Sequence, residues 1–383
     1  MATIARAARE AVSERRGNRP DWILFATMVV LAIFGLVMIY SATRSSGTFS
    51  MERQMIFVAA GIVLYLVASM IDYREYRALI PYIYGGIVVL LIAVFFFPER
   101  KGAQRWIELG LFDLQPAEVA KIVVVLGIAS ILSPQNRDEL RPDLTWPKIG
   151  LVILTVGVPA GLIYQQPDLG TMLVFVFVMM AMLFAAGASW RQLLTLVGAG
   201  TAVTVALYRM GAIAEYQLNR IRVLVDPTVD PQGIGYNLAQ SKLAIGSGQL
   251  LGRGLFKGTQ TNFQYVPEQE TDFIFTAVAE QLGFVGGVVV LLAYMILIWR
   301  ILVIAANARD RFGALVAIGV AATFMFHIFI NIGMTMGITP VTGLPLPFLS
   351  LGGSAFMSLA FALGIVNSIW LRRSPVPGEQ YVM

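Results

Sequence analysis

The feature that most constrains this chain is a series of long apolar stretches separated by shorter polar connections. The hydrocarbon core of a bilayer is about 30 Å thick, so a spanning helix needs roughly 20 apolar residues. Composition agrees, because 57% of the 383 residues are hydrophobic and 13% are charged, against about 25% charged in a soluble domain. We therefore predict an all-α, polytopic integral membrane protein. The ten predicted spans are residues 22–42, 54–71, 78–97, 116–133, 148–164, 169–187, 190–209, 273–299, 313–336 and 352–371.

The two ends of the chain carry no separate domain in this prediction. No small-residue cleavage pattern follows the first apolar stretch, so it is expected to be a retained helix rather than a cleaved signal peptide. We predict a basic tail at 1–21, a single ten-helix membrane domain at 22–373, and a C-terminal tail at 374–383. The chain has no cysteine, which excludes a disulfide framework and thiol catalysis.

Lysine and arginine residues indicate the orientation. If the N-terminus is inside, the inner connections and tails hold 16 of them, and the short outer connections hold 5. The positive-inside rule then predicts a multi-pass protein of the cytoplasmic membrane with both termini cytoplasmic. The net charge of +5 follows from this topology, and no clustered basic patch on a soluble module indicates a nucleic-acid partner.

The outer connections are longer and richer in polar residues than the inner ones. They are residues 98–115, 165–168, 338–353 and, above all, 210–272. Long connections are often functional, and an amphipathic stretch at 236–245 predicts a short helix lying in the membrane interface. An ordinary extracytoplasmic loop between spans seven and eight is the alternative.

Charged residues inside the spans are costly unless they pair or face a wet cavity. Glu118 and Lys121 share a helix face near the outer surface. They form either a neutralised packing pair or the polar lining of an outward-facing cavity. Glu280 either faces the same cavity or is a hydrogen-bonded core carboxylate. Asp168 stands at the start of the sixth span, where it is either a residue of the functional site or only a helix cap.

Two glycine runs in the largest connection lie near basic residues. Residues 246–248 and 252–254, with Lys242, Arg253 and Lys257, could hold a diphosphate through backbone N–H groups and charge. Simple turns are the alternative. A dinucleotide site is excluded, because the runs do not follow a strand in a βαβ unit.

Elimination leaves carboxylates as the groups for chemistry at the outer face. His327 is the only histidine and lies deep in a span, where we expect a packing residue. Cys–His and Ser–His pairs at the outer face and the usual zinc sites are therefore excluded. The candidates are Glu268, Glu270 and Asp272. Asp272 stands immediately before an apolar run, which favours a rigidly held general base, with a helix cap as the alternative.

Four segments carry a family resemblance. They are GYNLAQSKLAIGSGQLLGRGLFKGTQTNFQYVPEQETDFIFTAVAEQLGFVGG at 235–287, RWIELGLFDLQPAEVAK at 105–121, QQPDLGT at 165–171 and PVTGLPLPFLSLGG at 340–353. In this order the chain strongly resembles the SEDS family of RodA- and FtsW-type bacterial cell-wall polymerases. The GTQT at 258–261 is more similar to the rod-elongation RodA branch. Ala117, Leu351 and Ala355 stand where the family usually has Ser, Tyr and Ser, which weakens any role for hydroxyls there.

The resemblance implies a peptidoglycan glycosyltransferase that polymerises lipid II at the outer face of the membrane, for cell elongation and shape. Undecaprenyl diphosphate would leave, and Asp272 would be the general base toward the acceptor sugar's 4-hydroxyl. Mg²⁺ or Mn²⁺ could help the diphosphate to leave, whereas no nucleotide, haem or flavin is expected. The implied partners are a class B penicillin-binding protein and other membrane proteins of the elongation complex. The expected substrate-binding or cavity-lining residues are Glu118, Lys121, Arg105, Asp168, Gln240, Ser241, Lys242, Glu268 and Glu280.

Two other function classes stay open. A lipid II flippase would suit ten spans and an intramembrane Glu–Lys pair, although the inner halves of the spans offer few polar groups. A non-catalytic scaffold for a penicillin-binding protein would not need buried charge, and would tolerate leucine in place of Glu118 and Lys121.

Overall fold

The structure is a computed structural model that describes residues 19–45, 50–99, 103–108, 110, 113–133 and 144–373. The C-terminal tail predicted at 374–383 and most of the basic tail lie outside these residues. The elements are α2 (Trp22–Thr43), α3 (Ser50–Met70), α4 (Tyr73–Ala93), η1 (Val94–Phe96), β1 (Ile107–Glu108), β2 (Asp113–Leu114), α5 (Pro116–Leu132), α6 (Trp146–Gln165), α7 (Leu169–Ala185), α8 (Trp190–Arg209), α9 (Glu215–Val225), η2 (Pro227–Val229), α10 (Ile234–Gly248), α11 (Thr259–Asn262), α12 (Ile274–Ala306), α13 (Arg311–Met336) and α14 (Gly353–Leu371). The two strands pair antiparallel, with Ile107 opposite Leu114.

Helices stand at all ten predicted span positions, and the predominantly helical fold class is confirmed. Among the described residues, seven helices are long and apolar enough to cross a membrane: Trp22–Thr43, Met51–Met70, Tyr73–Phe96, Trp146–Gln165, Ile274–Ala306, Arg311–Met336 and Gly353–Leu371. The helix α7 is apolar but only 17 residues long, α5 has the same length, and α8 is less apolar. The count of ten spans therefore stays a prediction.

Local capping explains where several helices begin. Asp21, Asp168 and Asp310 each accept a backbone N–H of the first turn of α2, α7 and α13. Such bonds satisfy donors that have no partner within the helix. Ser189 and Gln192 form a capping box at α8, and Pro116 occupies the first turn of α5, where a missing N–H costs nothing.

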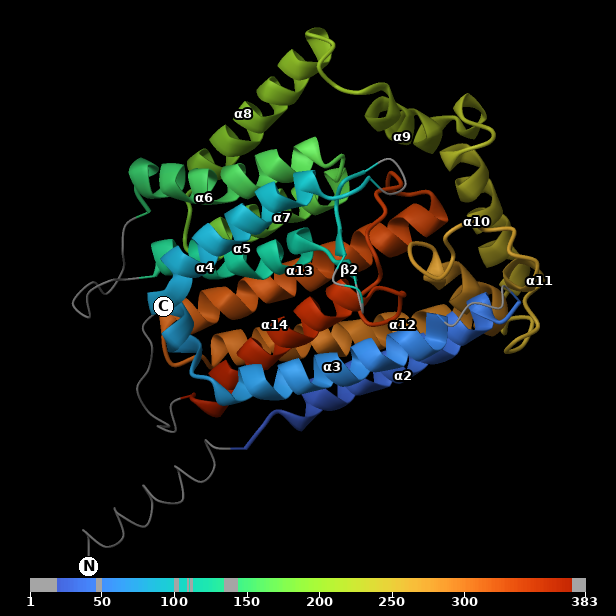
Figure 1. Cartoon of the computed structure of the whole chain (residues 1–383), viewed down its shortest axis with the longest axis horizontal. Helices are drawn as coiled ribbons and strands as arrows, with labels where there is room; N and C mark the ends of the chain where they lie inside the picture. Colours follow the sequence, from blue (N-terminus) through green and yellow to red (C-terminus); the bar gives the residue numbers. More distant parts are fainter. Residues whose placement is uncertain are drawn as a thin grey trace, which may run out of the picture.

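The long helices run side by side as a bundle, and α8 leads away from it toward an arch made by α9, α10 and α11 (Figure 1). The helix α13 packs against α5, α7, α10, α12 and α14, while α14 packs chiefly on α3. Most residues of α13 and α14 are buried. These two helices therefore form the centre of the bundle, and most of the surrounding helices expose apolar side chains outward.

The two ends of the bundle differ in chemistry. At one end, ion pairs join Arg74 to Asp310 at 3.0 Å and Arg300 to Asp21 at 2.5 Å. Their basic members come from connections predicted to be cytoplasmic. The opposite end carries the β1–β2 hairpin, α11 and the irregular segment 338–352 (Figure 1). The orientation of these ends in the membrane remains the prediction made from the sequence.

The helix predicted at 236–245 exists as α10, but it packs on α12 and α13 instead of lying only at a membrane surface. Leu238, Ser241 and Ala244 are buried. A Cβ atom at Gly248 would lie 1.9 Å from the Ala279 carbonyl oxygen, so this crossing accepts only glycine. Gly248 in α10 and Gly252 after it are thus close-packing positions, and the diphosphate role of the two runs stays a prediction.

Candidate active site

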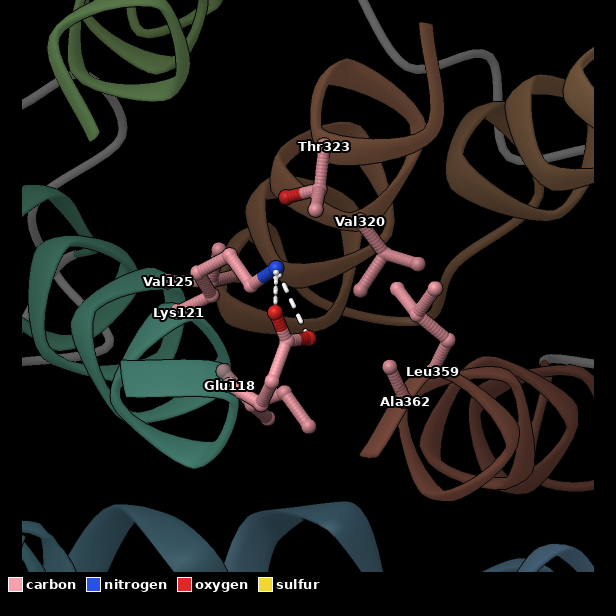
Figure 2. Close-up of a pocket in the computed structure, with 8 residues that line it drawn as sticks. Glu118, Lys121, Val125, Val320, Thr323, Leu359 and Ala362 are labelled. Atoms are coloured by element: carbon pink, nitrogen blue, oxygen red, sulfur yellow. Dashed lines mark hydrogen bonds and ion pairs between the residues drawn. The ribbon is translucent and has the colours of Figure 1, made fainter. Parts of the chain in front are cut away.

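The charged pair in α5 is deeply buried. Lys121 Nζ lies 2.8 Å from Glu118, and both side chains are only 2% exposed. Figure 2 shows the two side chains pointing toward one another beside a small cavity. The cavity has a volume of about 10 Å³, which is room for about one water molecule. This geometry matches a neutralised pair better than the lining of an open cavity.

His327 was expected to be a satisfied packing residue rather than a catalyst, and in the structure both of its ring nitrogens have polar partners. Its Nε2 lies 3.0 Å from Lys121 Nζ, and its Nδ1 lies 3.2 Å from the Pro345 carbonyl oxygen. An ammonium group can only donate, so Nε2 accepts and Nδ1 donates. The neutral imidazole therefore links the α5 ion pair to the segment 338–352. Sequence reasoning missed this link because Lys121 and His327 are 206 residues apart.

Asp272 stands two residues before α12 and is half-buried. The N-cap of α12 is Phe273, so the position of helix cap does not belong to Asp272. A Cβ atom on Gly343 would lie 3.3 Å from Asp272 Oδ2, so the carboxylate faces the backbone of the segment 338–352. Asn331 Nδ2 donates to the Asp272 carbonyl oxygen at 2.8 Å.

The two neighbouring carboxylates have other surroundings. Glu268 is exposed, and its carbonyl oxygen accepts the Asp272 N–H at 3.0 Å. Glu270 accepts the Leu351 N–H through its own carbonyl oxygen at 2.7 Å. Both residues therefore shape the turn that carries Asp272. The hydrogen bond between Leu351 and Glu270 joins two backbone groups, so it forms although Leu351 replaces the Tyr that the family usually has at this position.

Two arginines belong to this region, Arg105 in the connection 98–115 and Arg220 in the same connection as Asp272. Arg105 Nε donates to the Gln166 carbonyl oxygen at 2.8 Å, and Arg220 Nη1 donates to the Thr342 carbonyl oxygen at 3.1 Å. Burial lowers the pKa of Arg220, the positive charge of Arg105 lowers it further, and Asp168 and Asp272 act in the opposite direction. Arg220 thus lies close enough to interact with each of these three groups, which come from the connections 98–115, 165–168 and 210–272. A guanidinium stays protonated regardless.

Arg220 has an unsatisfied donor. Its Nε is buried, and among the described residues no hydrogen-bond acceptor reaches it. A buried donor without a partner costs about 1–3 kcal/mol, so a ligand or water that accepts from Nε would be favoured. Sequence reasoning did not single out Arg220, because it is one of six Lys and Arg residues spread over the largest connection and its end.

Asp168 has a capping role. It accepts from Thr171 N at 3.1 Å and from Thr171 Oγ1 at 3.0 Å, which makes it the N-cap of α7. Gln115 Nε2 lies 3.4 Å from its second oxygen. Its negative charge still faces Arg220, so the cap also contributes to the electrostatics of this region.

The remaining predicted residues lie around α10 and α11. Ser241 is buried and donates to the Thr335 carbonyl oxygen at 2.6 Å, Lys242 is exposed beside Gly337 at the end of α13, and Gln240 is half-buried. Ser241 and Lys242 thus belong to the packing of α10 on α13. Arg253 donates to the Ser247 carbonyl oxygen at the end of α10 and to Thr259 Oγ1 at the start of α11.

Glu280 is fully buried and holds α11. Its carboxylate accepts from Gln260 N at 2.8 Å, from Thr261 N at 3.0 Å and from Thr261 Oγ1 at 2.7 Å. This is the hydrogen-bonded carboxylate that the sequence left as an alternative. Replacing Glu280 with Gln keeps one acceptor oxygen and removes the charge and the second acceptor.

We expect Glu280→Gln to destabilise the segment 256–262 by about 1–3 kcal/mol, read as faster proteolysis or amide exchange there. Glu268→Gln, which changes an exposed carboxylate, is the matched control and should leave exchange in 256–262 unchanged. Equal protection in Glu280→Gln and wild type would contradict the anchoring role of this carboxylate.

Among the residues that the structure describes, no three His, Cys, Asp or Glu side chains come together as candidate metal ligands. Mg²⁺ commonly uses one or two carboxylates together with substrate phosphates and water. Asp272 is the carboxylate placed for such an arrangement. An ion held only by protein side chains does not fit this group of residues.

Comparison with known proteins decides the family. A family model described as a cell cycle protein, which covers FtsW, RodA and SpoVE, matches residues 21–374. This chain belongs to the FtsW/RodA/SpoVE family. The SEDS resemblance seen in the four sequence segments is thereby confirmed.

Members of the family are similar over nearly the whole chain. The peptidoglycan glycosyltransferase MrdB of Escherichia coli is 39% identical, covering 92% of this chain and 94% of MrdB. The peptidoglycan glycosyltransferase RodA of Treponema pallidum is 32% identical, covering 92% of this chain and 98% of that protein.

Solved structures of the family share the fold. A chain from a peptidoglycan synthase complex that coordinates polymerisation and crosslinking has a TM-score of 0.80 and 29% identity, covering 92% of this chain and 98% of its own length. The rod shape determining protein RodA of Thermus thermophilus has a TM-score of 0.66 and 28% identity, covering 92% and 97%.

Proposed function

We propose that this protein is a peptidoglycan glycosyltransferase that polymerises lipid II at the outer face of the cytoplasmic membrane, for cell elongation and shape. The observation that carries the proposal is that Arg220 interacts with both Asp272 and Arg105 and keeps a buried Nε donor without a partner among the described residues. A carboxylate that interacts with a guanidinium group, with a second guanidinium group next to that one, suits a reaction in which a hydroxyl loses a proton while a diphosphate leaves.

In the proposed reaction, the guanidinium groups bind the diphosphate of the donor. Arginine binds phosphate oxygens through paired, charge-assisted hydrogen bonds. The oxygen of the acceptor sugar's 4-hydroxyl attacks the anomeric carbon of the donor, and Asp272 accepts the proton of that hydroxyl. The bond from that carbon to the phosphate oxygen breaks, and undecaprenyl diphosphate carries away the electron pair. Arg105 and Arg220 stabilise the charge that develops on the leaving group.

The membrane placement follows from the substrate. A site at the predicted outer end lets the undecaprenyl tail remain in the bilayer while the sugars reach Asp272. Ten spans and cytoplasmic termini are part of this proposal and are supported by the distribution of Lys and Arg. A donor that carries its own diphosphate needs no nucleotide on that side. A Mg²⁺ or Mn²⁺ ion would add charge stabilisation at the diphosphate, and a chelator titration tests for it.

A class B penicillin-binding protein is the proposed partner. The synthase complex whose chain shares this fold couples polymerisation with crosslinking, which supports a transpeptidase partner here. Other membrane proteins of the elongation complex would assemble with the pair.

The test is polymerisation of purified lipid II by the detergent-solubilised protein with its penicillin-binding partner. Glycan strands on a gel and release of undecaprenyl diphosphate are the expected results. If the protein makes no strands but scrambles labelled lipid II across vesicles, it is a flippase. If it does neither while still binding the partner, it is a scaffold.

Replacing Arg220 with Gln tests the diphosphate contact. Hydrogen bonds to charged groups contribute about 1.5–3 kcal/mol, so kcat/KM for lipid II should fall by about 10- to 100-fold. The matched control is Arg222→Gln on the same helix, because Arg222 pairs with exposed Glu215 at 2.8 Å and should be dispensable. Equal losses in the two variants would mean that Arg220 supports α9 rather than the substrate.

A further inference from the structure

The segment 338–352 lacks regular secondary structure apart from turns and contains Pro340, Pro345 and Pro347. Its carbonyl groups therefore need partners from elsewhere, because buried backbone acceptors are almost always satisfied. Four successive carbonyl contacts come from side chains of other helices. The hydrogen bonds run from Arg220 to the Thr342 carbonyl oxygen and from Asn331 to that of Leu344. They also run from His327 to the carbonyl oxygen of Pro345 and from Tyr294 to that of Pro347.

Two of these donors lie on one face of α13. His327 and Asn331 are four residues apart, so they are neighbours on the helix surface, and both are fully buried. They hold the consecutive carbonyl groups of Pro345 and Leu344 at 3.2 Å and 2.8 Å. The middle of the segment is thus fastened to α13 at two adjacent points.

Each donor also has a second partner, and the second partners differ. Asn331 Nδ2 donates to the Asp272 carbonyl oxygen at 2.8 Å as well, so one amide group joins the segment to the residue proposed as the base. His327 Nε2 accepts from Lys121, whose other partner is Glu118. A continuous chain of polar contacts therefore runs from Glu118 through Lys121, His327, the Leu344–Pro345 backbone and Asn331 to Asp272.

We propose that His327 and Asn331 are positioning residues for Asp272, and that the Glu118–Lys121 pair acts on the reaction through them rather than by touching the substrate. The proposal rests on the proposed function for its effect on catalysis. Its structural part concerns only what holds the backbone of 338–352 and the turn at 268–273. The contact of Lys121 Nζ with Nε2 orients the His327 ring so that Nδ1 is directed at the Pro345 carbonyl oxygen.

The first readout is amide hydrogen exchange of the full-length protein, which does not depend on activity. In Asn331→Leu, which has a similar shape and no donor, amides in 338–352 and 268–273 should exchange about ten-fold faster, as expected when a bond of about 1.4 kcal/mol is lost. Amides of α5 should keep their wild-type protection. His327→Phe should loosen 338–352 in the same way.

The matched control is Thr323→Val. Thr323 lines the same small cavity one turn before His327, but its hydroxyl donates to the Gly319 carbonyl oxygen within α13. This variant should leave exchange unchanged in both segments. Faster exchange throughout the bundle in the Asn331 and His327 variants would overturn the proposal, because it would show a general role in stability.

A double-variant experiment tests the connection to the ion pair. Glu118→Gln combined with Lys121→Met, which leaves no lone buried charge, should speed exchange of 338–352 in the wild-type background and add little in the His327→Phe background, because changes within one connected set of contacts are not additive. Additive effects would show that the ion pair and His327 act separately, and would overturn the proposed route.

The second readout is the kinetics of polymerisation. Asn331→Leu should lower kcat about ten-fold or more, as expected from misplacing a catalytic group, with KM changed less than about two-fold, since neither side chain contacts the substrate in this proposal. A rise in KM at constant kcat would overturn it. If wild type makes no glycan, the exchange results still decide the structural part, so the two proposals can fail separately.

Discussion

Replacing Asp272 with asparagine is expected to lower the rate of lipid II polymerisation by about 10²–10⁴-fold, the usual contribution of a general base. The amide has nearly the shape of the carboxylate, so the turn at 268–272 should persist and the unfolding temperature should stay near that of wild type. The assay compares initial rates of strand formation at equal amounts of folded protein.

The control for this change is Glu268→Gln. Glu268 is exposed and belongs to the same turn, so the same chemical change four residues away should leave the rate within about two-fold of wild type if only Asp272 accepts the proton. Equal rates in wild type and Asp272→Asn would move the chemistry to another carboxylate. A loss in both variants would show that the turn, not the base, was damaged.

Replacing Lys121 with methionine is expected to lower the free energy of unfolding by about 3–5 kcal/mol, because it leaves the buried Glu118 carboxylate without its cation. Glu118 has only a 3.4 Å contact from Ser358 Oγ as a further side-chain partner among the described contacts. The measurement is the thermal unfolding of the purified protein in detergent, followed by circular dichroism.

The double variant Glu118→Gln with Lys121→Met separates charge burial from packing. Removing both charges should recover most of the lost stability, since the desolvation cost of a lone carboxylate disappears. Unfolding of Lys121→Met at the wild-type temperature would indicate that water reaches Glu118 through the small cavity. A double variant that is stable yet inactive would fit the proposed route through His327.

Much of the fold could be predicted from the sequence because the signals are local. Apolar runs near the length of a bilayer core placed a helix at every predicted position. The position of Asp168 directly before an apolar run predicted a helix cap as one alternative, and in the structure Asp168 is the N-cap of α7. The helix in the largest connection was also found, although its packing against α12 and α13 was not.

Long-range pairing explains what the sequence left open for Glu280. Its depth in a span suggested either a cavity or a satisfied carboxylate, and only the approach of α11 decided between them. The partner segment lies 19 residues away, in a loop whose path follows from the close crossing of α10 and α12. No local pattern near Glu280 carries that information.

By itself, the sequence determined the helical membrane architecture and the family, because hydrophobic length, capping and ordered motifs are read along the chain, and it predicted Asp272 as the leading carboxylate. Only the tertiary structure decided that the charges of Arg220 and Asp272 interact and that His327 bonds Lys121 across 206 residues. Asn331 likewise meets Asp272 across 59 residues. The physical reason is that hydrogen bonds and charge interactions act over a few ångströms, and the packing of α5, α12 and α13 is what brings these side chains within reach.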